Sequence, residues 1–578
     1  MMPGSTGPVA GVDIGNATTE VAVMAGGKLL GADRLPTRGR KGSAESVQGA
    51  AALLRRVERR LGIEVAEVSI APLRAADTAT LTVPALPPRT GRLTVLAAGV
   101  ATPGGGGICV GRPFTLDNSH RPVPGGDLIA LVPPGVGYAA AAGRVRELLA
   151  GGVPVGAVLT AGDEGVLIAN RLGAPVPVLD QVDTAAAGAC PLLAVEVRPP
   201  GRPLTMLTDP VALGAALGLG DGEAADAVSL SRLLLDYSNA VIGLASPVAS
   251  GPPADLPEPW LEAGDRRLPL RTACADLATW PPGTVTMLGS PAGPTPVDDL
   301  FALDLGQVAD AATARQGGTS RTVLVASLHR TPADVDHAAL LAELTGRPVR
   351  SLISEPAAAR LGALTTPGAR PDAAVIDIGA GTIDVIAPGR EVVAAGAGDL
   401  LTAAVAETLA LPRAAADWVK RGPCLRVTGS QQFEAEDGSH GFLDRPAAAT
   451  SLGMLAAPGP AGLLPFDRRH SPAEWRAIRL RLKEAVFAVN LRRVLRDGVL
   501  RDGVLRDGVL RDGVLDCPPG TQVLIVGGPA GDDELLGVLL RSLGIMAGRG
   551  NVGGTLPGGP PAGHRYAAAL GLALAAAS

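Results

Sequence analysis

Two stretches of the chain share one pattern of hydrophobic, glycine and polar positions. Residues 9–22 read VAGVDIGNATTEVA and residues 373–386 read AAVIDIGAGTIDVI. In each, an apolar run predicts a strand that ends near an aspartate, a glycine-containing turn follows, and a mixed apolar and polar run predicts a second strand. A second glycine turn, a third strand and a helix (44–61 and 399–411) complete each unit. The repeat therefore predicts two similar lobes.

The first turn of each unit is typical of a phosphate-binding loop. Gly15, and Gly379 with Gly381, can adopt backbone angles closed to other residues, so we expect their N–H groups to contact an anion. Asp13 and Asp377 end the first strands, where they would hold a hydrated Mg²⁺ on the phosphates. An ordinary hairpin with an acidic rim would explain one copy, but two matched copies indicate a polyphosphate clamped between lobes. The expected nucleotide-binding residues of the two turns are Gly15, Asn16, Ala17, Thr18, Gly379, Gly381, Thr382 and Asp384.

Two more segments belong to this set. Residues 523–544, VLIVGGPAGDDELLGVLLRSLG, predict a buried strand, a turn at Gly527 and Gly528, and an amphipathic helix with an acidic first turn. We expect this turn to seat an adenosine. Residues 354–364, SEPAAARLGAL, open a helix whose Glu355 would orient water or metal-bound water, unless it is a plain N-terminal helix acid. The candidate catalytic residues are Asp13, Asp377 and Glu355.

The order of these segments resembles that of the actin-like ATPase fold, a duplicated ribonuclease H-like α/β architecture shared by sugar kinases, actin and heat-shock chaperones. The resemblance implies binding of ATP or ADP with Mg²⁺. Two other nucleotide-binding folds are disfavoured, because the chain has no GxxxxGK[ST] motif and no GxGxxG that opens a helix after a strand.

The chain is longer than a minimal ATPase of this fold. At about 150 residues per domain, its 578 residues suggest three or four domains. Proline-rich stretches at 83–91 and 245–259 bracket an inserted α/β unit. The predicted division is a first part of the ATPase core (1–88), an inserted swivelling domain (89–251), a second part of the core (252–405), a linker or insert region (406–518) and a C-terminal part of the core (519–578).

The insert region contains a long predicted helix, 471–495, followed by four copies of RDGVL at 496–515. On a helix each five-residue repeat is turned by about 140° from the last, so the valine and leucine pairs form no face. On a strand the odd period flips faces at every copy, and the glycines oppose a helix as well. An irregular, turn-rich surface excursion is the prediction, and a partner-binding repeat is the alternative.

Composition limits the function classes. The 51 basic and 56 acidic residues give a net charge of −5, which argues against a nucleic-acid binder. With 47% hydrophobic and 19% charged residues the whole chain cannot be disordered, yet no apolar run of about 18 residues predicts a membrane span. Five scattered cysteines without a CxxC pair disfavour a disulfide framework and a structural zinc or iron–sulfur site. No secretory signal is visible, so we expect a cytoplasmic protein.

Nearly the whole chain resembles the large subunits of diol and glycerol dehydratase-reactivating factors. The segments that carry the resemblance include ATPGGGGICVG, GDEGVLIANRLGAPVPVLDQV, GALTTPGA, KEAVFAVNLRRVLR and GNVGGT. The resemblance implies a chaperone-like ATPase that acts with a small subunit as an α2β2 heterotetramer. Its client would be a coenzyme B12-dependent dehydratase from which damaged cobalamin must be released. The chain itself would not bind cobalamin, and association with a bacterial microcompartment is left open.

The resemblance also implies a metal site that joins the inserted domain to the small subunit. The matching positions are Thr102, Asp163 and Asp180. Two carboxylates and a hydroxyl suit Mg²⁺, or alternatively Ca²⁺, with water and an acid of the partner as further ligands. From spacing alone these aspartates would be surface acids. Related sequences tend to carry a second acid immediately before Asp163, where this chain has Gly162.

Other functions on the same fold fit less well. A sugar or polyol kinase would need a sugar-contacting catalytic aspartate, which no motif provides. A general chaperone would need a peptide-binding domain after the ATPase, and an activator of hydroxyacyl dehydratases would need cluster-ligating cysteines. No motif excludes a filament-forming actin relative, but the inserted domain argues against one. The nearest alternative is a reactivase for another B12 enzyme, such as ethanolamine ammonia-lyase.

Overall fold

The computed structural model describes residues 7–72, 81–83, 89–100, 102–116, 126–199, 202–235, 237–245, 259–290, 293–306, 308, 322–329, 335–459, 462–495, 522–543, 547–557 and 561–578. The chain forms two compact units. The first consists of Met1–Val83, Leu256–Val308 and Thr322–Ser578, and the second of Pro84–Asp255 and Ala309–Arg321.

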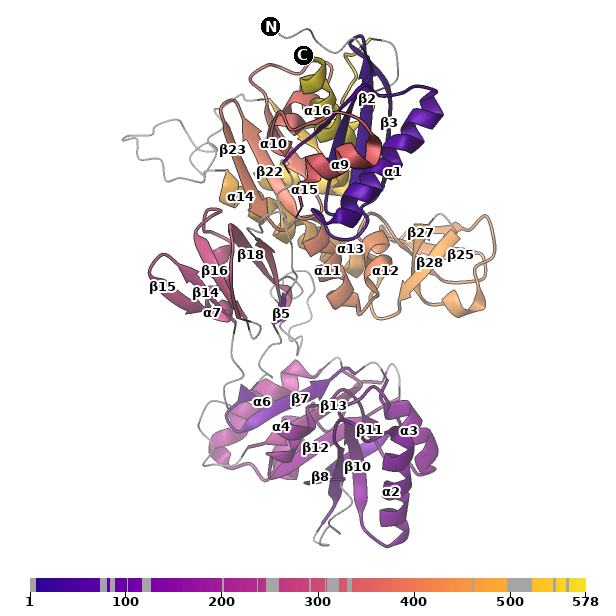
Figure 1. Cartoon of the computed structure of the whole chain (residues 1–578). Coiled ribbons are helices and arrows are strands. Elements are labelled where there is room, and N and C mark those ends of the chain that lie inside the picture. Colours follow the sequence, from indigo (N-terminus) through magenta and orange to yellow (C-terminus); the bar gives the residue numbers. More distant parts are fainter. Residues whose placement is uncertain are drawn as a thin grey trace. The chain divides into compact units, whose positions relative to one another are not determined.

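The first lobe of the first unit is a five-stranded sheet covered by helices (Figure 1). Its strands, in spatial order, are β20 (Val349–Arg350), β4 (Glu67–Ile70), β1 (Val9–Ile14), β2 (Thr18–Ala25) and β3 (Lys28–Pro36). Helix α1 (Ala44–Leu61) starts at Ser43, whose hydroxyl accepts a hydrogen bond from the Ser46 N–H, and ends at a left-handed Gly62. The buried face of α1 packs on the sheet together with α9 (His337–Thr345).

The second lobe repeats this plan, as the sequence predicted. Its sheet has the order β23 (Arg390–Ala395), β22 (Thr382–Ala387), β21 (Ala374–Ile378), β29 (Val523–Val526) and β30 (Ala547–Arg549). Helix α11 (Gly398–Leu409) follows its third strand as α1 follows β3. The registers of the two hairpins agree, because Asp13 lies opposite Glu20 and Asp377 lies opposite Asp384.

Two helices, α10 (Glu355–Ala363) and α16 (Ala567–Ala577), connect the lobes. They approach so closely that a methyl group added at Gly571 would lie 1.8 Å from the backbone oxygen of Ala358. A methyl group at Gly362 would lie 2.0 Å from the backbone oxygen of Ala567. Both glycines are therefore required by the packing.

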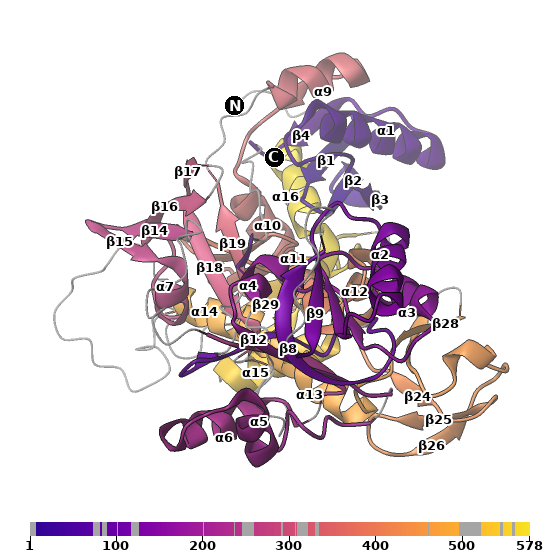
Figure 2. The ribbon, with the colours of Figure 1, turned by 90° about the horizontal axis from the view of Figure 1, so that it is seen from below.

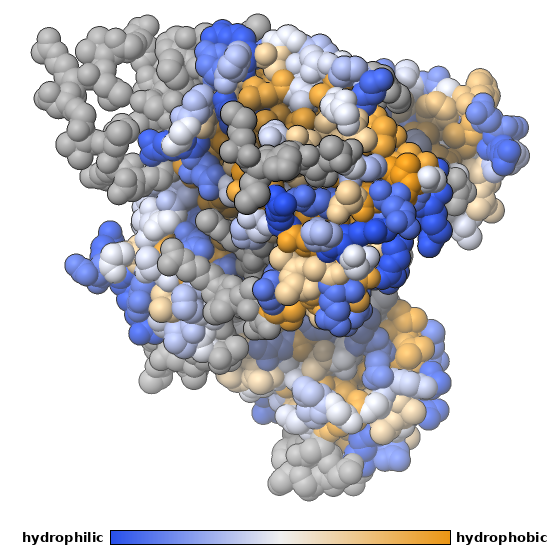
Figure 3. All heavy atoms as spheres, turned by 45° about the horizontal axis from the view of Figure 1, so that its top comes forward, coloured by the Kyte–Doolittle hydropathy of each residue, from blue (hydrophilic) through white to orange (hydrophobic). Residues whose placement is uncertain are grey.

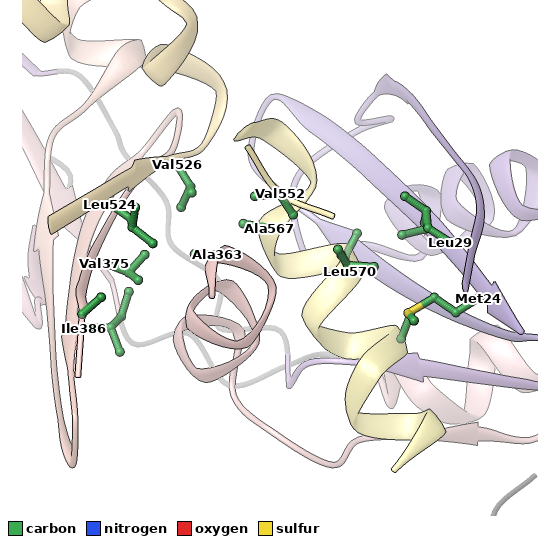
Figure 4. Packing of buried hydrophobic residues seen from close by; sticks show 14 of the residues in the cluster. Met24, Leu29, Ala363, Val375, Ile386, Leu524, Val526, Val552, Ala567 and Leu570 are labelled. Carbon is green, nitrogen blue, oxygen red and sulfur yellow. The ribbon is translucent and has the colours of Figure 1, made fainter. Parts of the chain in front are cut away.

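One hydrophobic cluster continues across both lobes around these helices (Figure 4). Met24 extends from the first lobe, Val375 and Leu524 from the second, and Ala363 and Leu570 from the two helices between them. All five are buried, so the lobes share one core at this level.

The second lobe carries a small antiparallel sheet, which we call the insert sheet. It follows α12 (Arg413–Val419) and has the order β26 (His440–Phe442), β25 (Gln432–Ala435), β24 (Leu425–Val427), β27 (Leu455–Gly459) and β28 (Gly462–Asp467). The long helix predicted next is present, but it contains a π-helical turn at Glu484–Ala488, between α13 (Pro472–Lys483) and α14 (Val489–Val494). The RDGVL run at 496–515 lies outside the described residues, so its irregular course stays a prediction.

Two further sheets complete the first unit. The first contains β15 (Arg266–Pro269), β14 (Trp260–Ala263), β16 (Val285–Ser290) and β17 (Gly293–Pro296), with α7 (Leu270–Leu277) beside it. The second contains β18 (Asp299–Asp304), β19 (Val323–Leu328) and β5 (Leu81–Val83). An ion pair of 2.7 Å between buried Arg493 and Asp299 ties α14 to β18.

The second unit is a mixed α/β domain built on one eight-stranded sheet. The order is β11 (Val178–Leu179), β10 (Val155–Thr160), β9 (Leu128–Val132), β8 (Gly107–Thr115), β12 (Leu192–Val197), β13 (Asn239–Leu244), β7 (Leu93–Ala98) and β6 (Arg89–Thr90). Its helices are α2 (Tyr138–Ala150), α3 (Gly165–Leu172), α4 (Thr184–Gly188), α5 (Pro210–Leu217) and α6 (Ala224–Leu233). Helices α2 and α3 pack together, and so do α5 and α6 (Figure 2).

Hydrophilic and hydrophobic residues are interspersed on the face drawn in Figure 3. Among the described residues, no helix has both the length and the apolar character needed to cross a membrane.

Candidate functional site

A cavity of about 730 Å³ lies in the first unit between the two hairpins. Of the thirteen nucleotide-binding and catalytic residues expected from the sequence, all but Asp384 line it. They are Asp13, Gly15, Asn16, Ala17, Thr18, Glu355, Asp377, Gly379, Gly381, Thr382, Gly527 and Gly528. Asp384 is buried behind them, next to Asp377 on the adjacent strand. The structure therefore brings together segments more than 300 residues apart in the chain.

Both hairpin turns are closed by the same hydrogen bond. The Gly15 N–H donates to the Thr18 carbonyl over 2.9 Å, and the Gly379 N–H donates to the Thr382 carbonyl over 2.9 Å. The expectation that these two N–H groups contact an anion is wrong for this reason. Gly15 instead makes the first turn possible, since a methyl group there would lie 2.8 Å from the Thr18 oxygen. At Gly379 a methyl group would lie 3.4 Å from the Thr382 oxygen, which is an ordinary contact. Of the three glycines expected to contact an anion, Gly381 is the one whose N–H makes no backbone hydrogen bond among the described residues.

Carboxylates crowd the floor of the cavity. Burial, followed by repulsion from Glu355 and Glu20, raises the pKa of Asp377 to about 7. Burial and repulsion from Glu355 also raise the pKa of Asp13 and of Asp384 well above the usual range. One carboxylate oxygen of Asp384 is buried without a hydrogen bond. Such a set favours a bound cation.

Lys41 supplies a positive charge that the sequence analysis missed. Its ammonium lies 2.7 Å from Glu355 Oε2, and only 9% of its side chain is exposed. Burial alone would lower the pKa of Lys41, but Glu355 and Asp13 outweigh it and the pKa is raised. Glu355 is thus both the first residue of α10 and half of a cavity ion pair. The only sequence signal was a lysine in the loop between the third strand and the first helix.

The predicted adenosine turn packs directly on the second hairpin. Gly527 has a φ of 89°, and a methyl group there would lie 2.3 Å from the Ile378 carbonyl oxygen. Asp532 caps α15 (Asp533–Leu543) by accepting a hydrogen bond from the Leu535 N–H. Lys483, which is fully buried, pairs with Asp532 over 2.6 Å and so fixes this wall of the cavity.

Behind this wall lies a buried charged cluster. Arg479 is fully buried and donates to Glu534 of α15 and to Glu436 beside the insert sheet. These ion pairs outweigh burial and lower the pKa of Glu534 to about 2. The ion pairs of Arg479 and Lys483 link α15 to the insert sheet, and each of these two cations has a carboxylate partner.

The three residues expected to bind a second metal ion meet in the second unit. Thr102 Oγ1 lies 2.6 Å from Asp180 Oδ2 and 3.0 Å from Asp163 Oδ1, and its single hydrogen can be donated to only one of them. Asp180 is fully buried, its Oδ1 has no hydrogen-bond partner, and burial raises its pKa. Among the described residues, no group of three or more acidic, histidine or cysteine side chains is arranged so that it could hold a metal ion by itself. These residues fit a hard cation only with ligands from outside the chain.

The duplicated lobes, the cavity between their hairpins and the inserted second unit define the class of actin-like ATPases with an inserted domain. Two family models match the chain: the diol dehydratase reactivase ATPase-like domain over residues 290–576, and the DD-reactivating factor swiveling domain over residues 93–248. The chain therefore belongs to the diol dehydratase reactivase family, which confirms the resemblance seen in the sequence.

Full-length relatives agree with this assignment. The chain is 29% identical to the propanediol dehydratase-reactivating factor large subunit of Citrobacter freundii, and 28% identical to the diol dehydratase-reactivating factor large subunit of Klebsiella michiganensis. Each alignment covers 98% of both chains. A solved structure of a diol dehydratase-reactivating factor in nucleotide-free form matches 99% of each chain with a TM-score of 0.56 and 25% identity. A glycerol dehydratase reactivase shares the fold with a TM-score of 0.54 at 24% identity, over 98% of this chain and 99% of that one.

The crowded carboxylates predict a pH-dependent stability. The pKa of Asp377 is about 7 in the folded chain against an ordinary 3.8, so the folded state binds more protons than the unfolded state between these values. Without divalent cations or nucleotide, the melting temperature should fall as the pH rises from about 4 to about 7. Asp377→Asn should flatten this fall, whereas Asp372→Asn, at an exposed aspartate paired with Arg370, should not. Parallel melting profiles of the wild type and Asp377→Asn would contradict the electrostatic description.

Proposed function

We propose that the chain is the large subunit of an ATP-dependent reactivating factor for a coenzyme B12-dependent diol or glycerol dehydratase. In this role it releases damaged cobalamin from the inactivated dehydratase, so that intact coenzyme can bind again. The observation that carries the proposal is the full-length similarity to reactivating-factor large subunits, which spans both the cavity-bearing unit and the inserted unit.

The cavity is the proposed site of ATP binding and hydrolysis. Mg²⁺ bound near Asp13 and Asp377 would neutralise charge on the phosphates. Thr18 and Thr382 occupy equivalent places in the two hairpins, and their hydroxyl groups would donate to the terminal phosphates instead of to Glu20 and Asp384. Glu355 is held by Lys41 at the cavity wall, where it can accept a hydrogen bond from the attacking water and orient it. Gly527 and Gly528 lie where an adenosine can reach the second hairpin.

The second unit is the proposed attachment point of the small subunit. Thr102, Asp163 and Asp180 would hold a Mg²⁺ or Ca²⁺ ion whose remaining ligands are water and an acid of the small subunit. The unpartnered Oδ1 of Asp180 supports this, because a buried carboxylate oxygen without a donor favours a cation. Val166 and Leu167 of the adjacent α3 are 40% and 42% exposed and add an apolar surface beside the ion. Two large and two small subunits would form the complex.

Reactivation can be assayed directly with the co-expressed small subunit and a diol dehydratase inactivated with cyanocobalamin. We expect MgATP to release cyanocobalamin and, with free adenosylcobalamin, to restore diol turnover. Asp377→Ala should abolish ATP hydrolysis and release without unfolding the chain, while Asp372→Ala should retain both. If ATP is hydrolysed but cyanocobalamin is not released, the proposed client enzyme is wrong. If Asp377→Ala keeps full activity, the proposed ATP site is wrong.

The bridging ion predicts metal-dependent assembly. EDTA should weaken binding of the small subunit to the wild-type chain by at least about tenfold, because a shared ligand set is lost. Asp180→Asn should bind the small subunit weakly with or without EDTA. Asp183→Asn is the matched control, since Asp183 only caps α4 through the N–H groups of Ala185 and Ala186. Binding of the wild type that is insensitive to EDTA, measured by surface plasmon resonance, would argue against the ion.

A further inference from the structure

One difference between the two hairpin units lies on their third strands, where Arg34 lines the cavity and its counterpart in the second lobe does not. In the first lobe Asp13 lies opposite Glu20, and Glu20 lies opposite Arg34 of β3, so three charged residues form a row across the strands. In the second lobe the corresponding row is Asp377, Asp384 and Val393. A guanidinium therefore stands in the first lobe at the place where the second lobe has an aliphatic side chain.

A second arginine enters the cavity from the C-terminal segment. The turn η6 (His564–Tyr566) is fastened to the adenosine turn: the Gly527 N–H donates to the His564 carbonyl over 2.9 Å, and His564 Nδ1 lies 2.8 Å from the Gly527 oxygen. This places Arg565 over Gly528, where an added methyl group would lie 3.0 Å from Arg565 Nη1. The backbone of the second lobe thus presents Arg565 to the cavity.

These two arginines differ from the other cations that line the cavity. Lys41 pairs with Glu355, and both Lys420 and Arg421 pair with Asp417. The guanidinium groups of Arg34 and Arg565 form no hydrogen bond or ion pair with any described residue, although Glu20 attracts both at longer range. Burial and repulsion by Arg34 lower the pKa of Arg565. Two neighbouring unpaired guanidiniums therefore offer a site for an anion.

The chemistry of the surroundings points to a phosphoryl group. A guanidinium presents a planar fork of donors that matches phosphate oxygens, and it stays charged at neutral pH. The carboxylates on the cavity floor repel an anion, so an anionic group is most stable beside the unpaired cations. Arg34 belongs to the first lobe, and Arg565 is held by the second. An anion between them would connect the lobes.

We propose that Arg34 and Arg565 form a phosphoryl subsite of the cavity, which holds a phosphate oxyanion between the two lobes. The proposal rests on the nucleotide-binding function proposed for the cavity. The oxyanion is either a phosphate group of the bound nucleotide or inorganic phosphate that remains after hydrolysis.

Titration calorimetry on the full chain separates these cases with four probes: adenosine, MgADP, MgATP and inorganic phosphate alone. The variants are Arg34→Met, Arg565→Met and Arg565→Lys. Arg59→Met is the matched control, because Arg59 is exposed on α1 and does not line the cavity. Each methionine variant should lower the affinity for MgADP and MgATP about tenfold to a hundredfold, since one charged hydrogen-bonding group is lost. The affinity for adenosine should not change. Arg565→Lys should retain part of the affinity.

Melting curves provide a second readout. Without ligand, Arg565→Met should melt no lower than the wild type, because an unpaired and partly buried charge is removed. With MgATP its melting temperature should rise less than that of the wild type. A lower melting temperature without ligand would assign Arg565 a structural role and overturn the proposal.

The binding outcomes also separate the subsite from the proposed function. Loss of phosphate binding in the variants with unchanged nucleotide affinity supports the subsite and identifies its ligand as inorganic phosphate. Unchanged binding of every probe, or an equal loss for adenosine, overturns the subsite while wild-type MgATP binding leaves the proposed function standing. A wild-type chain that binds no nucleotide contradicts the proposed function. In that case the subsite stands if the wild type binds inorganic phosphate more tightly than the arginine variants do, and it is overturned if their phosphate affinities are equal.

Discussion

Helices α10 and α16 cross at a distance that only the smallest side chains permit. Gly362 and Gly571 each face a backbone oxygen of the opposite helix, and Gly11 of β1 faces the backbone oxygen of Ala569 in the same way. Both helices begin at the cavity, α10 with Glu355 and α16 directly after the turn that carries Arg565. The packing of α10 against α16 therefore determines where Glu355 and Arg565 lie relative to the two hairpins. The geometry of the rest of the site depends on this packing.

The distribution of charge in the cavity suits a ligand that has both positively and negatively charged parts. Its floor holds more carboxylates than Lys41 can neutralise, while Arg34 and Arg565 on its wall have no carboxylate within ion-pair distance among the described residues. A nucleotide with a divalent cation supplies positive charge to the floor and negative charge to the wall. Arg479 and Lys483, by contrast, are already paired with carboxylates, and they hold in place the cavity wall that contains Asp532.

The local sequence pattern predicted both hairpins, the turn at Gly527 and Gly528, and the helix that begins with Glu355. The sequence analysis missed Lys41 and Arg565, because these residues reach the cavity only when distant segments of the chain fold together. Strand register, which a single hairpin motif does not reveal, aligns Arg34 with Glu20. The N–H groups of Gly15 and Gly379 were assigned to an anion because the motif does not show that the turn uses them. The meeting of Thr102 with Asp163 and Asp180 was expected from family resemblance, since spacing alone indicated surface acids.

The most direct test of the account is to widen the helix crossing without touching the cavity. Gly571→Ala places a methyl group 1.8 Å from the Ala358 oxygen, whereas Gly143→Ala, inside α2, meets nothing within 4 Å. Overpacking of this kind costs about 1–3 kcal/mol. Measured by thermal melting and MgADP titration, Gly571→Ala should lower both the melting temperature and the nucleotide affinity, and Gly143→Ala should lower neither. Unchanged stability and affinity in Gly571→Ala would contradict the central role of the crossing.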